Sequence, residues 1–296
     1  MQFDPQQLAA LAAVLRRGSF DAAAADLSVT ASAVSQRIKA LEDRVGSALI
    51  RRGAPCTATP AGQRLAKHAE DVALLEAQVS RDLALKRGSG AMTLRVAVNA
   101  DSLATWFVAA MAAVPDVLFD LVIDDQDHSS DWLKRGAVSA AISAQEKPAP
   151  GCDAIPLGSL RYVATASPAF MRRWFADGLT AETLSRAPCL TFNAKDMLQR
   201  RWIAETLGLK LSPPTHFLPS THAFVEAARR GVGWGMNPEA LVREPIRDSL
   251  LVPLQRGTHL DVALTWQVSR VMAQALKPVT DSVRMAARKE LVAPGA

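Results

Sequence analysis

The fold of the N-terminal region is decided by the stretch Val29-Thr-Ala-Ser-Ala-Val-Ser-Gln-Arg-Ile-Lys-Ala-Leu-Glu42. Its apolar residues recur at the spacing of one helix face: Val34, Ile38, Leu41 and, just beyond, Val45. Thr30 is a favourable N-cap, and Gly46 is the kind of residue that commonly ends a helix. The pattern therefore predicts an amphipathic helix from Thr30 to Val45.

Short polar and cationic side chains occupy the opposite face of this helix. Hydroxyl, amide and cationic groups of this kind hydrogen-bond base edges and phosphates in the major groove of DNA. Arg37 lies nearer the flank, where a phosphate contact or packing suits it better. A helix face that only contacts solvent would carry the same kinds of residue, so the neighbouring segments are needed to distinguish DNA contact from simple solvent exposure. The candidate DNA-contacting residues of the helix are Thr30, Ser32, Ser35, Gln36, Arg37 and Lys39.

Two shorter helical segments precede this helix. Asp4-Pro5 places an N-cap before a proline at the first helical position, and Gly18 ends the first segment. Ser19 caps a second segment that runs to Leu27 and is rich in alanine. Small side chains let another helix cross closely, so the three segments together predict a helix-turn-helix.

A hairpin is predicted after the three helices. Leu49-Ile-Arg-Arg52 is a short strand-like run, and Ala54-Pro-Cys-Thr-Ala-Thr59 supplies a turn and a returning strand. Such a wing would bring Arg51 and Arg52 to the sugar-phosphate backbone, and both are candidate DNA contacts.

The helix that begins at Pro60 carries one apolar stripe. Its members are spaced by three or four residues: Leu65, Ala69, Val72, Leu75, Val79 and Leu83. This spacing is close to that of a coiled-coil seam, and a single helix that exposes such a seam is unstable. We therefore expect a partner helix and a homodimer, with a homotetramer left open. Arg87-Gly-Ser-Gly90 supplies a flexible break after the helix.

Composition and charge limit the classes of function. The chain has 296 residues and a net charge of +5, with nine basic and only five acidic residues up to residue 67. A basic module of this size suits phosphate contacts. No apolar run is long enough to span a membrane and no secretory signal is visible, so we expect a cytoplasmic protein with no membrane partner. Three scattered cysteines, and histidines without metal-ligand spacing, predict no disulfide framework, no metal and no cofactor.

Beyond residue 92 the chain alternates between strand and helix patterns. Strands are predicted at residues 93–98, 117–123 and 138–142. One helix is expected to begin near Asp101, after the first strand, and another to run through Leu133, after the second strand. This alternation predicts parallel sheets, with a ligand crevice at the carboxyl ends of the strands. A break near Leu157-Gly158, and an apolar strand at 262–266, indicate that the chain crosses out of one subdomain and back.

Polar residues follow several of these strands. Ser102 and Thr221 stand at predicted helix N-termini, where hydroxyls and free N–H groups suit a carboxylate. Asp124 and Asp125 follow the second strand, where acids could pair with an ammonium or guanidinium group. An amino acid with a cationic side chain would match both, although helix caps and surface acids are common. The spacing does not separate arginine from lysine, and no catalytic constellation stands out.

Six stretches carry a family resemblance. Gly18-Ser-Phe-Asp-Ala-Ala-Ala24, Thr59-Pro-Ala-Gly62 and the Val29 to Glu42 stretch resemble the LysR-type transcriptional regulators. Three further stretches are similar to the arginine- and lysine-responsive branch of that family, the ArgP/LysG type: Val98-Asn-Ala-Asp-Ser-Leu-Ala-Thr-Trp106, Asp124-Asp-Gln-Asp-His128 and Gly231-Val-Gly-Trp-Gly-Met236. Members of that branch control the export of basic amino acids.

The resemblance implies an α+β chain of three parts. A winged helix-turn-helix DNA-binding domain would cover residues 1–59, and a linker and dimerisation helix with its hinge would cover 60–91. An α/β effector-binding domain would cover 92–296, as two periplasmic-binding-protein-like subdomains, one formed by 92–160 and 267–296 and the other by 161–266. The candidate effector-binding residues are Asn99, Asp101, Ser102, Asp124, Asp125, Ser143 and Thr221.

The leading hypothesis is a transcription regulator that binds double-stranded promoter DNA, responds to lysine or arginine and works with RNA polymerase. Two alternatives belong to other classes: an α/β enzyme acting on amino acids with an appended DNA-binding domain, and an architectural DNA-binding protein without a ligand. The operator, the target gene and the choice between activation and repression stay open.

Overall fold

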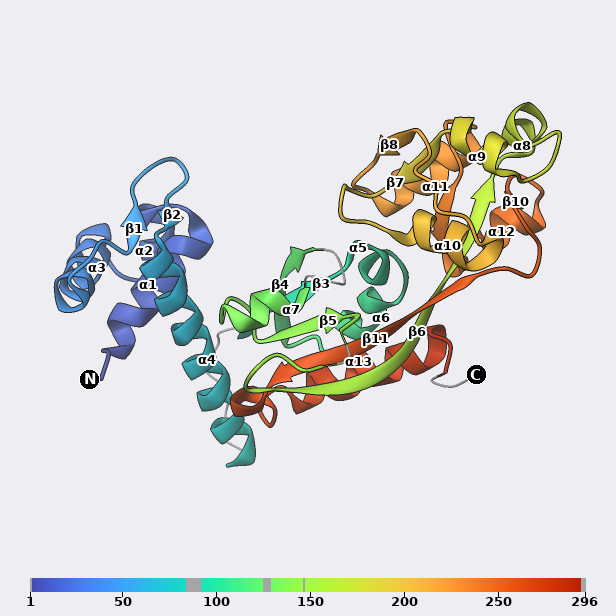
Figure 1. The fold of residues 1–296 in the computed structure, drawn as a ribbon. Coiled ribbons are helices and arrows are strands. Elements are labelled where there is room, and N and C mark those ends of the chain that lie inside the picture. Colours follow the sequence, from blue (N-terminus) through green and yellow to red (C-terminus); the bar gives the residue numbers. More distant parts are fainter. Residues whose placement is uncertain (1, 84–91, 125–128, 146, 294–296) are drawn as a thin grey trace.

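The computed structural model describes residues 2–83, 92–124, 129–145 and 147–293. The N-terminal domain is built from helices α1 (Pro5–Arg17), α2 (Phe20–Asp26) and α3 (Ala31–Val45), which pack around one apolar core (Figure 1). The predicted caps are present, since the side chains of Asp4, Ser19 and Thr30 each accept a backbone N–H of the first helical turn. The most deeply buried residues of this core are exposed by at most 1%, among them Leu11, Val14, Val34, Ile38 and Leu41.

The predicted wing is a two-stranded antiparallel ribbon of β1 (Ile50–Arg51) and β2 (Thr57–Ala58). The Glu42 carboxylate, near the end of α3, accepts hydrogen bonds from the backbone N–H groups of Leu49 (2.7 Å) and Ile50 (3.3 Å). On the returning strand, the Thr59 hydroxyl donates to the carbonyl of Ala48 at 2.8 Å. These contacts tie the wing to the helix that precedes it.

Gly62 lies where the following helix meets the wing. A Cβ atom at this position would lie 1.9 Å from the carbonyl oxygen of Leu49, far inside van der Waals contact. The Thr59 hydroxyl also accepts the backbone N–H of Gly62 at 3.1 Å. In this stretch Thr59 therefore caps the helix, and Gly62 is the residue small enough to lie against the carbonyl group of Leu49.

Helix α4 (Pro60–Asp82) connects the DNA-binding domain to the rest of the chain. Part of its predicted apolar stripe packs within the chain. Leu65 and Ala69 pack against the N-terminal core, and Leu75 packs against the core of the C-terminal domain. Val79 and Leu83 are 54% and 63% exposed. Three of the six members of the stripe thus have partners within the chain, and the expectation of a partner helix stays a prediction.

Charged side chains fill the contact between α4 and the C-terminal sheet. Lys67 is only 7% exposed and pairs with Asp71, whose carboxylate also accepts the hydroxyl of Ser139 at 3.3 Å. Burial raises the pKa of Glu70 to about 7, against the smaller opposing effects of Lys67 and Arg95. This charge cluster on α4 is thus tied to the sheet by electrostatics as well as by apolar packing.

The first half of the C-terminal domain is organised around three parallel strands. β3 (Met92–Val98) lies between β4 (Val117–Ile123) and β5 (Ala140–Ser143). A continuous helical stretch follows β3 as α5 (Ala100–Ser102), a π-helical turn η1 (Leu103–Phe107) and α6 (Val108–Ala112); α7 (Ser129–Lys134) precedes β5. Near the chain end, the 3-10 turn η2 (Arg270–Met272) leads to α13 (Lys277–Glu290), which packs against α6. The strands expected at 93–98, 117–123 and 138–142 are thereby confirmed to within two residues.

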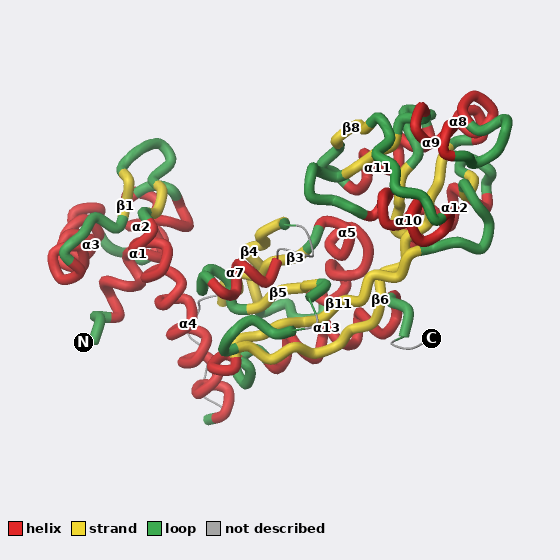
Figure 2. The backbone as a smooth tube through the Cα atoms, viewed as in Figure 1, coloured by secondary structure: helices red, strands yellow, loops and turns green. Residues whose placement is uncertain are grey.

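Two long antiparallel strands, β6 (Cys152–Ala166) and β11 (Leu260–Ser269), run from this half into the second one (Figure 2). The break predicted near Leu157-Gly158 is wrong as a chain break: β6 continues, and the pairing shifts register between Leu264 and Thr265. Gly158 has a φ of +121°, and a Cβ there would lie 2.5 Å from the carbonyl oxygen of Val292. Gly158 therefore permits a local bulge in β6 and does not interrupt the strand.

The second half contains shorter elements around the far ends of β6 and β11. In chain order these are α8 (Pro168–Trp174), α9 (Ala181–Arg186), β7 (Cys189–Thr191), α10 (Leu198–Leu207), β8 (Thr215–Phe217), α11 (Thr221–Arg229), β9 (Gly235–Pro238), α12 (Glu239–Arg247) and β10 (Val252–Pro253). β9 and β10 both pair with β6, whereas β7 and β8 form a separate parallel pair. The proposed subdomain limits at 160/161 and 266/267 fall inside β6 and β11. Within the described residues, no helix is both long and apolar enough to cross a membrane.

Candidate functional site

The exposed face of α3 carries the polar residues that the sequence selects. Ser32, Gln36 and Lys39 are exposed and Ser35 is half-buried, while Val34, Ile38 and Leu41 point into the core. The Thr30 hydroxyl caps the helix through the Ala33 N–H at 3.2 Å and lies 2.9 Å from the Ser32 hydroxyl. The helix therefore presents hydroxyl, amide and ammonium groups on one surface.

The arginines around this helix differ in their surroundings. Arg37 is half-buried and donates to the Gln6 side-chain oxygen on α1 at 2.8 Å, as suits a residue at the flank of the face. Arg51 and Arg52 on the wing are exposed. The Arg52 guanidinium lies 5.3 Å from the centre of the Phe20 ring, within cation–π range. The two wing arginines therefore remain accessible to a phosphate backbone.

A second candidate site lies where the two halves of the C-terminal domain meet. Asp101, just after β3, accepts two hydrogen bonds of 2.7 Å, one from the Tyr162 hydroxyl on β6 and one from the Thr221 hydroxyl at the start of α11. Tyr162 and Thr221 are buried and Asp101 is half-buried. One carboxylate thus bridges segments that are 61 and 120 residues away along the chain.

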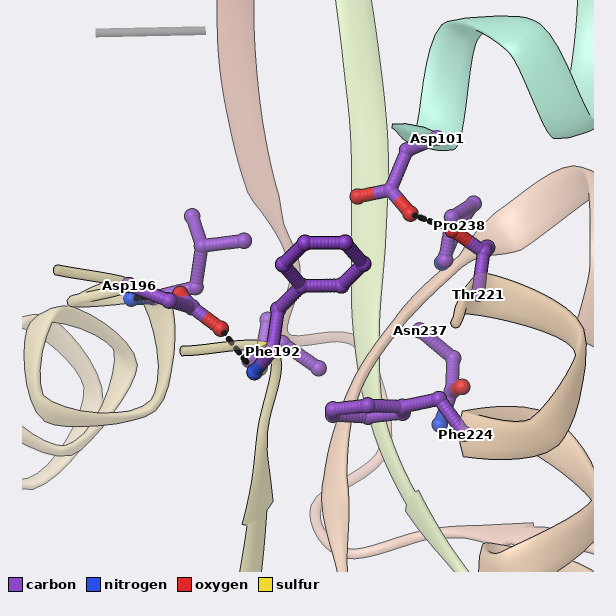
Figure 3. Close-up of a pocket in the computed structure, with 9 residues that line it drawn as sticks. Asp101, Phe192, Asp196, Thr221, Phe224, Asn237 and Pro238 are labelled. Atoms are coloured by element: carbon purple, nitrogen blue, oxygen red, sulfur yellow. Dashed lines mark hydrogen bonds between the residues drawn. The ribbon is translucent and has the colours of Figure 1, made fainter. Parts of the chain in front are cut away.

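Asp101 and Thr221 line a small pocket, which is shown in Figure 3. Besides Asp101 and Thr221 it is lined by Phe192, Asp196, Leu198, Phe224, Met236, Asn237 and Pro238. Its volume is about 20 Å³, room for about one water molecule. In the view of Figure 3 the Phe192 ring stands between Asp101 and Asp196, with Phe224 and Asn237 beneath it.

The pocket is rich in hydrogen-bond acceptors. Asp101 and Asp196 contribute carboxylates, and no arginine, lysine or histidine is among the described residues that line it. Asn237 is fully buried and donates to Thr165 at 2.9 Å, but its Oδ1 has no hydrogen-bond partner among the described residues. A buried acceptor of this kind is costly until a donor reaches it. The chemistry of the site therefore favours a cationic donor.

Other predicted effector residues lie near the pocket or apart from it. Asn99 and Ser102 are buried on the turn and helix that carry Asp101. Asp124 accepts the indole N–H of Trp132 at 2.8 Å, and the buried Ser143 hydroxyl accepts the backbone N–H of Gln145 at 3.0 Å. Asp125 lies outside the described residues. Of the seven candidates, the structure places Asp101 and Thr221 in the pocket lining.

Most of the lining was not selected from the sequence. Phe192, Asp196 and Leu198 come from the loop after β7 and the start of α10, and Asn237 comes from β9. The rule that selected Asp124, a polar residue after a strand, would also have pointed to the loop after β7. That strand has only three residues, too few for a recognisable alternation.

None of the three cysteines, all of which lie in the described part of the chain, takes part in a disulfide. Cys56, Cys152 and Cys189 are free, and burial raises the pKa of the last two thiols. Within residues 2–83, 92–124, 129–145 and 147–293, no group of three or more histidine, cysteine or acidic side chains is arranged to hold a metal ion.

Comparison with known proteins agrees with this architecture. Residues 5–63 match the bacterial regulatory helix-turn-helix of the lysR family, and residues 87–288 match the LysR substrate binding domain. The HTH-type transcriptional regulator LysG of Mycobacterium tuberculosis (strain ATCC 25618 / H37Rv) is 45% identical over 286 residues, which cover 97% of this chain and 94% of LysG.

Two solved structures extend the likeness to the whole fold. The crystal structure of ArgP from Mycobacterium tuberculosis has a TM-score of 0.76 and 44% identity, with 99% of this chain and 100% of that one covered. Full-length LysG from Corynebacterium glutamicum with bound effector Arg has a TM-score of 0.65 and 33% identity, with 98% and 99% covered. This chain belongs to the LysR family of DNA-binding transcriptional regulators, with an N-terminal helix-turn-helix and a C-terminal substrate-binding domain.

Proposed function

We propose that this regulator responds to L-arginine or L-lysine bound in the pocket between the two halves of its C-terminal domain, and that it controls a gene for the export of basic amino acids. The observation that carries the proposal is the acceptor-rich lining, with Asp101, Asp196 and the unpaired Oδ1 of Asn237. The Corynebacterium glutamicum relative, whose structure contains bound effector Arg, supports the same ligand class.

The closed pocket suggests how such a ligand would act. A space of about 20 Å³ is too small for an amino acid, so binding requires the two halves to separate or rearrange. The ligand's ammonium or guanidinium donors would replace those of Tyr162 and Thr221 on Asp101. A ligand shifts a conformational equilibrium only by its differential affinity for the two states; here the states would differ in whether Asp101 bridges the halves.

The partners of the protein would be promoter DNA, further copies of this chain and RNA polymerase. We propose that the N-terminal domain binds promoter DNA through Thr30, Ser32, Ser35, Gln36 and Lys39, with Arg37, Arg51 and Arg52 beside them. The exposed Val79 and Leu83 on α4 support a homodimer, which could pair again into a tetramer. A regulator of this kind works in the cytoplasm and acts on RNA polymerase at the promoter.

Thermal melting of the full-length protein across the twenty amino acids tests the ligand. A molecule that binds only the folded state raises the melting temperature, so arginine or lysine should give a selective rise. Asp101→Asn removes the charged acceptor, and the affinity should fall by about tenfold or more. Asp281→Asn, a surface acid paired with Lys277 on α13, is the matched control and should leave the rise unchanged.

The outcomes separate this proposal from its alternatives. No rise with any basic amino acid, despite a cooperative melt, removes the ligand assignment but leaves DNA binding in place. Turnover of a basic amino acid would favour the enzyme alternative. Equal affinity for promoter and random DNA at physiological salt would favour an architectural protein.

A further inference from the structure

A second, larger cavity lies beside the loop that follows β7. Its volume is about 140 Å³, and its lining includes Cys189, Asn193, Asp196, Gln199, Arg200 and Phe217. Asp196 lines both spaces, so they share a wall although they are separate cavities. Nothing in the proposed effector response uses this one.

Gln199 is the unexplained polar group of the cavity. Its side chain is only 2% exposed, yet its Oε1 has no hydrogen-bond partner among the described residues. The amide nitrogen is 3.5 Å from Asp196 Oδ2, at the long limit for a hydrogen bond. Buried amide oxygens are nearly always paired. This oxygen is closed off from solvent, so a donor in the cavity that Gln199 lines would reach it after a small turn of the side chain.

Opposite charges also face the cavity. Arg200 is exposed and lies in the first turn of α10, whose first backbone N–H, that of Leu198, donates to Asp196 Oδ1 at 3.0 Å. Asp196 carries the negative charge. Both act on the thiol of Cys189: burial is the main cause of its raised pKa, Asp196 raises the pKa further and Arg200 lowers it. The cation and the carboxylate therefore border the same space.

We propose that this cavity is a second ligand site, for a small zwitterionic amino acid whose carboxylate binds Arg200 and whose ammonium donates to Gln199 Oε1. Arginine-to-carboxylate hydrogen bonds of this type are among the strongest in proteins. The volume is about seven times that of the effector pocket and corresponds to several water molecules, which suits an amino acid with a side chain of the size of serine. The proposal stands independently of the effector pocket.

Calorimetric titration of the full-length protein with L-serine tests the site. Arg200→Ala removes the cation and should weaken binding by about tenfold or more. Gln199→Met keeps the length of the side chain and removes the acceptor, so binding should fall similarly while the melting temperature does not. Arg201→Ala is the matched control: this neighbour pairs with Glu205 on the outer face of α10, and its loss should leave serine binding unchanged.

Two ligand analogues and one cross-variant complete the test. L-Serine methyl ester lacks the free carboxylate and L-glycerate carries a hydroxyl in place of the ammonium, and neither should bind measurably. The Asp101→Asn variant should bind serine as the wild type does, because Asp101 lines the other pocket. The proposal is overturned if cooperatively melting wild-type protein shows no heat with serine, if Arg200→Ala and Gln199→Met bind as well as wild type, or if Asp101→Asn abolishes the serine signal.

Discussion

The DNA-binding domain and the cleft of the C-terminal domain hold their functional residues in opposite ways. The residues proposed to read DNA lie on one exposed face of α3, within ten positions of each other, and the buried face of the same helix fixes their direction. The cleft instead joins Asp101, Tyr162 and Thr221 from three distant elements through a single carboxylate. The first site is encoded locally, and the second exists only when the two halves meet.

This difference has a consequence for how each site responds to change. A helix face survives as long as its own domain folds. A pocket shared between two halves changes shape whenever they move, so it can couple ligand binding to conformation. If the two regions are independent, a change in one of them should leave the other unaffected.

The largest effect is expected at Gly62, where helix α4 meets the wing. Gly62→Ala places a Cβ atom 1.9 Å from the Leu49 carbonyl oxygen and should destabilise the DNA-binding domain by about 3 kcal/mol or more. Gly46→Ala is the control: its φ is +75° but the space around it is open, so about 1 kcal/mol is expected. All six tryptophans lie beyond residue 100, so their fluorescence reports the C-terminal domain, and far-ultraviolet circular dichroism reports both. A tryptophan transition that shifts together with the helical one would show that the two regions unfold as one unit.

The next effect concerns Glu70, on the helix between the two regions. Its pKa is raised to about 7 from 4.5. Between these two pH values the native state therefore keeps a proton on Glu70 that the unfolded state has already released. The free energy of unfolding should therefore fall as pH rises from about 4.5 to 7 and change little above that. Glu70→Gln removes this dependence and should be more stable than wild type at pH 8 by up to about 3 kcal/mol, with little difference near pH 4.5.

Urea denaturation at several pH values measures the Glu70 effect. Glu76→Gln, an exposed acid on the same helix, is the matched control and should follow wild type. An identical pH profile for Glu70→Gln and wild type would mean that Glu70 is already ionised in the folded protein, and that the contact of α4 with the sheet is looser than described.

Substitutions on the DNA-binding face should separate specific from general contacts. Gln36→Ala should cost about 1–3 kcal/mol of affinity for a promoter fragment and little for random DNA. Arg51→Ala on the wing should weaken both alike and reduce the slope of log affinity against log salt by about 1. Fluorescence anisotropy with both DNAs measures this. Equal losses on both DNAs for Gln36→Ala would remove base readout from α3.

The smallest effect is expected at the surface ion pair of Asp26 with Arg16 and Arg17. Hydrogen bonds from the two arginines lower the pKa of Asp26 to about 2, so its contribution is present above about pH 4 and is lost as pH falls toward 2. Because the arginines are exposed, Asp26→Asn should cost less than about 1 kcal/mol at neutral pH. High salt should shrink the difference; a larger, salt-insensitive loss would indicate a packing role instead.

The elements that were predicted well are those whose signals are local. The α3 face, the capped starts at Asp4, Ser19 and Thr30, and the three parallel strands follow from spacing and capping along the chain. The features that local signals did not show depend on tertiary partners: the α4 stripe is partly used within the chain, and Gly158 permits a bulge against Val292. Neither partner is near in sequence.

The sequence by itself determined the DNA-binding domain of this protein, because a helix period, N-caps and glycines that end helices act over a few residues. It also pointed to Thr221 at a predicted helix N-terminus, and the family resemblance pointed to Asp101. Only the tertiary structure decided that these two meet, that Tyr162 joins them, and that Asp196 and Asn237 complete an acceptor-rich pocket. The physical reason is that hydrogen bonds between side chains 60 to 120 residues apart depend on how β6 and β11 place one half against the other, and no local pattern encodes that placement.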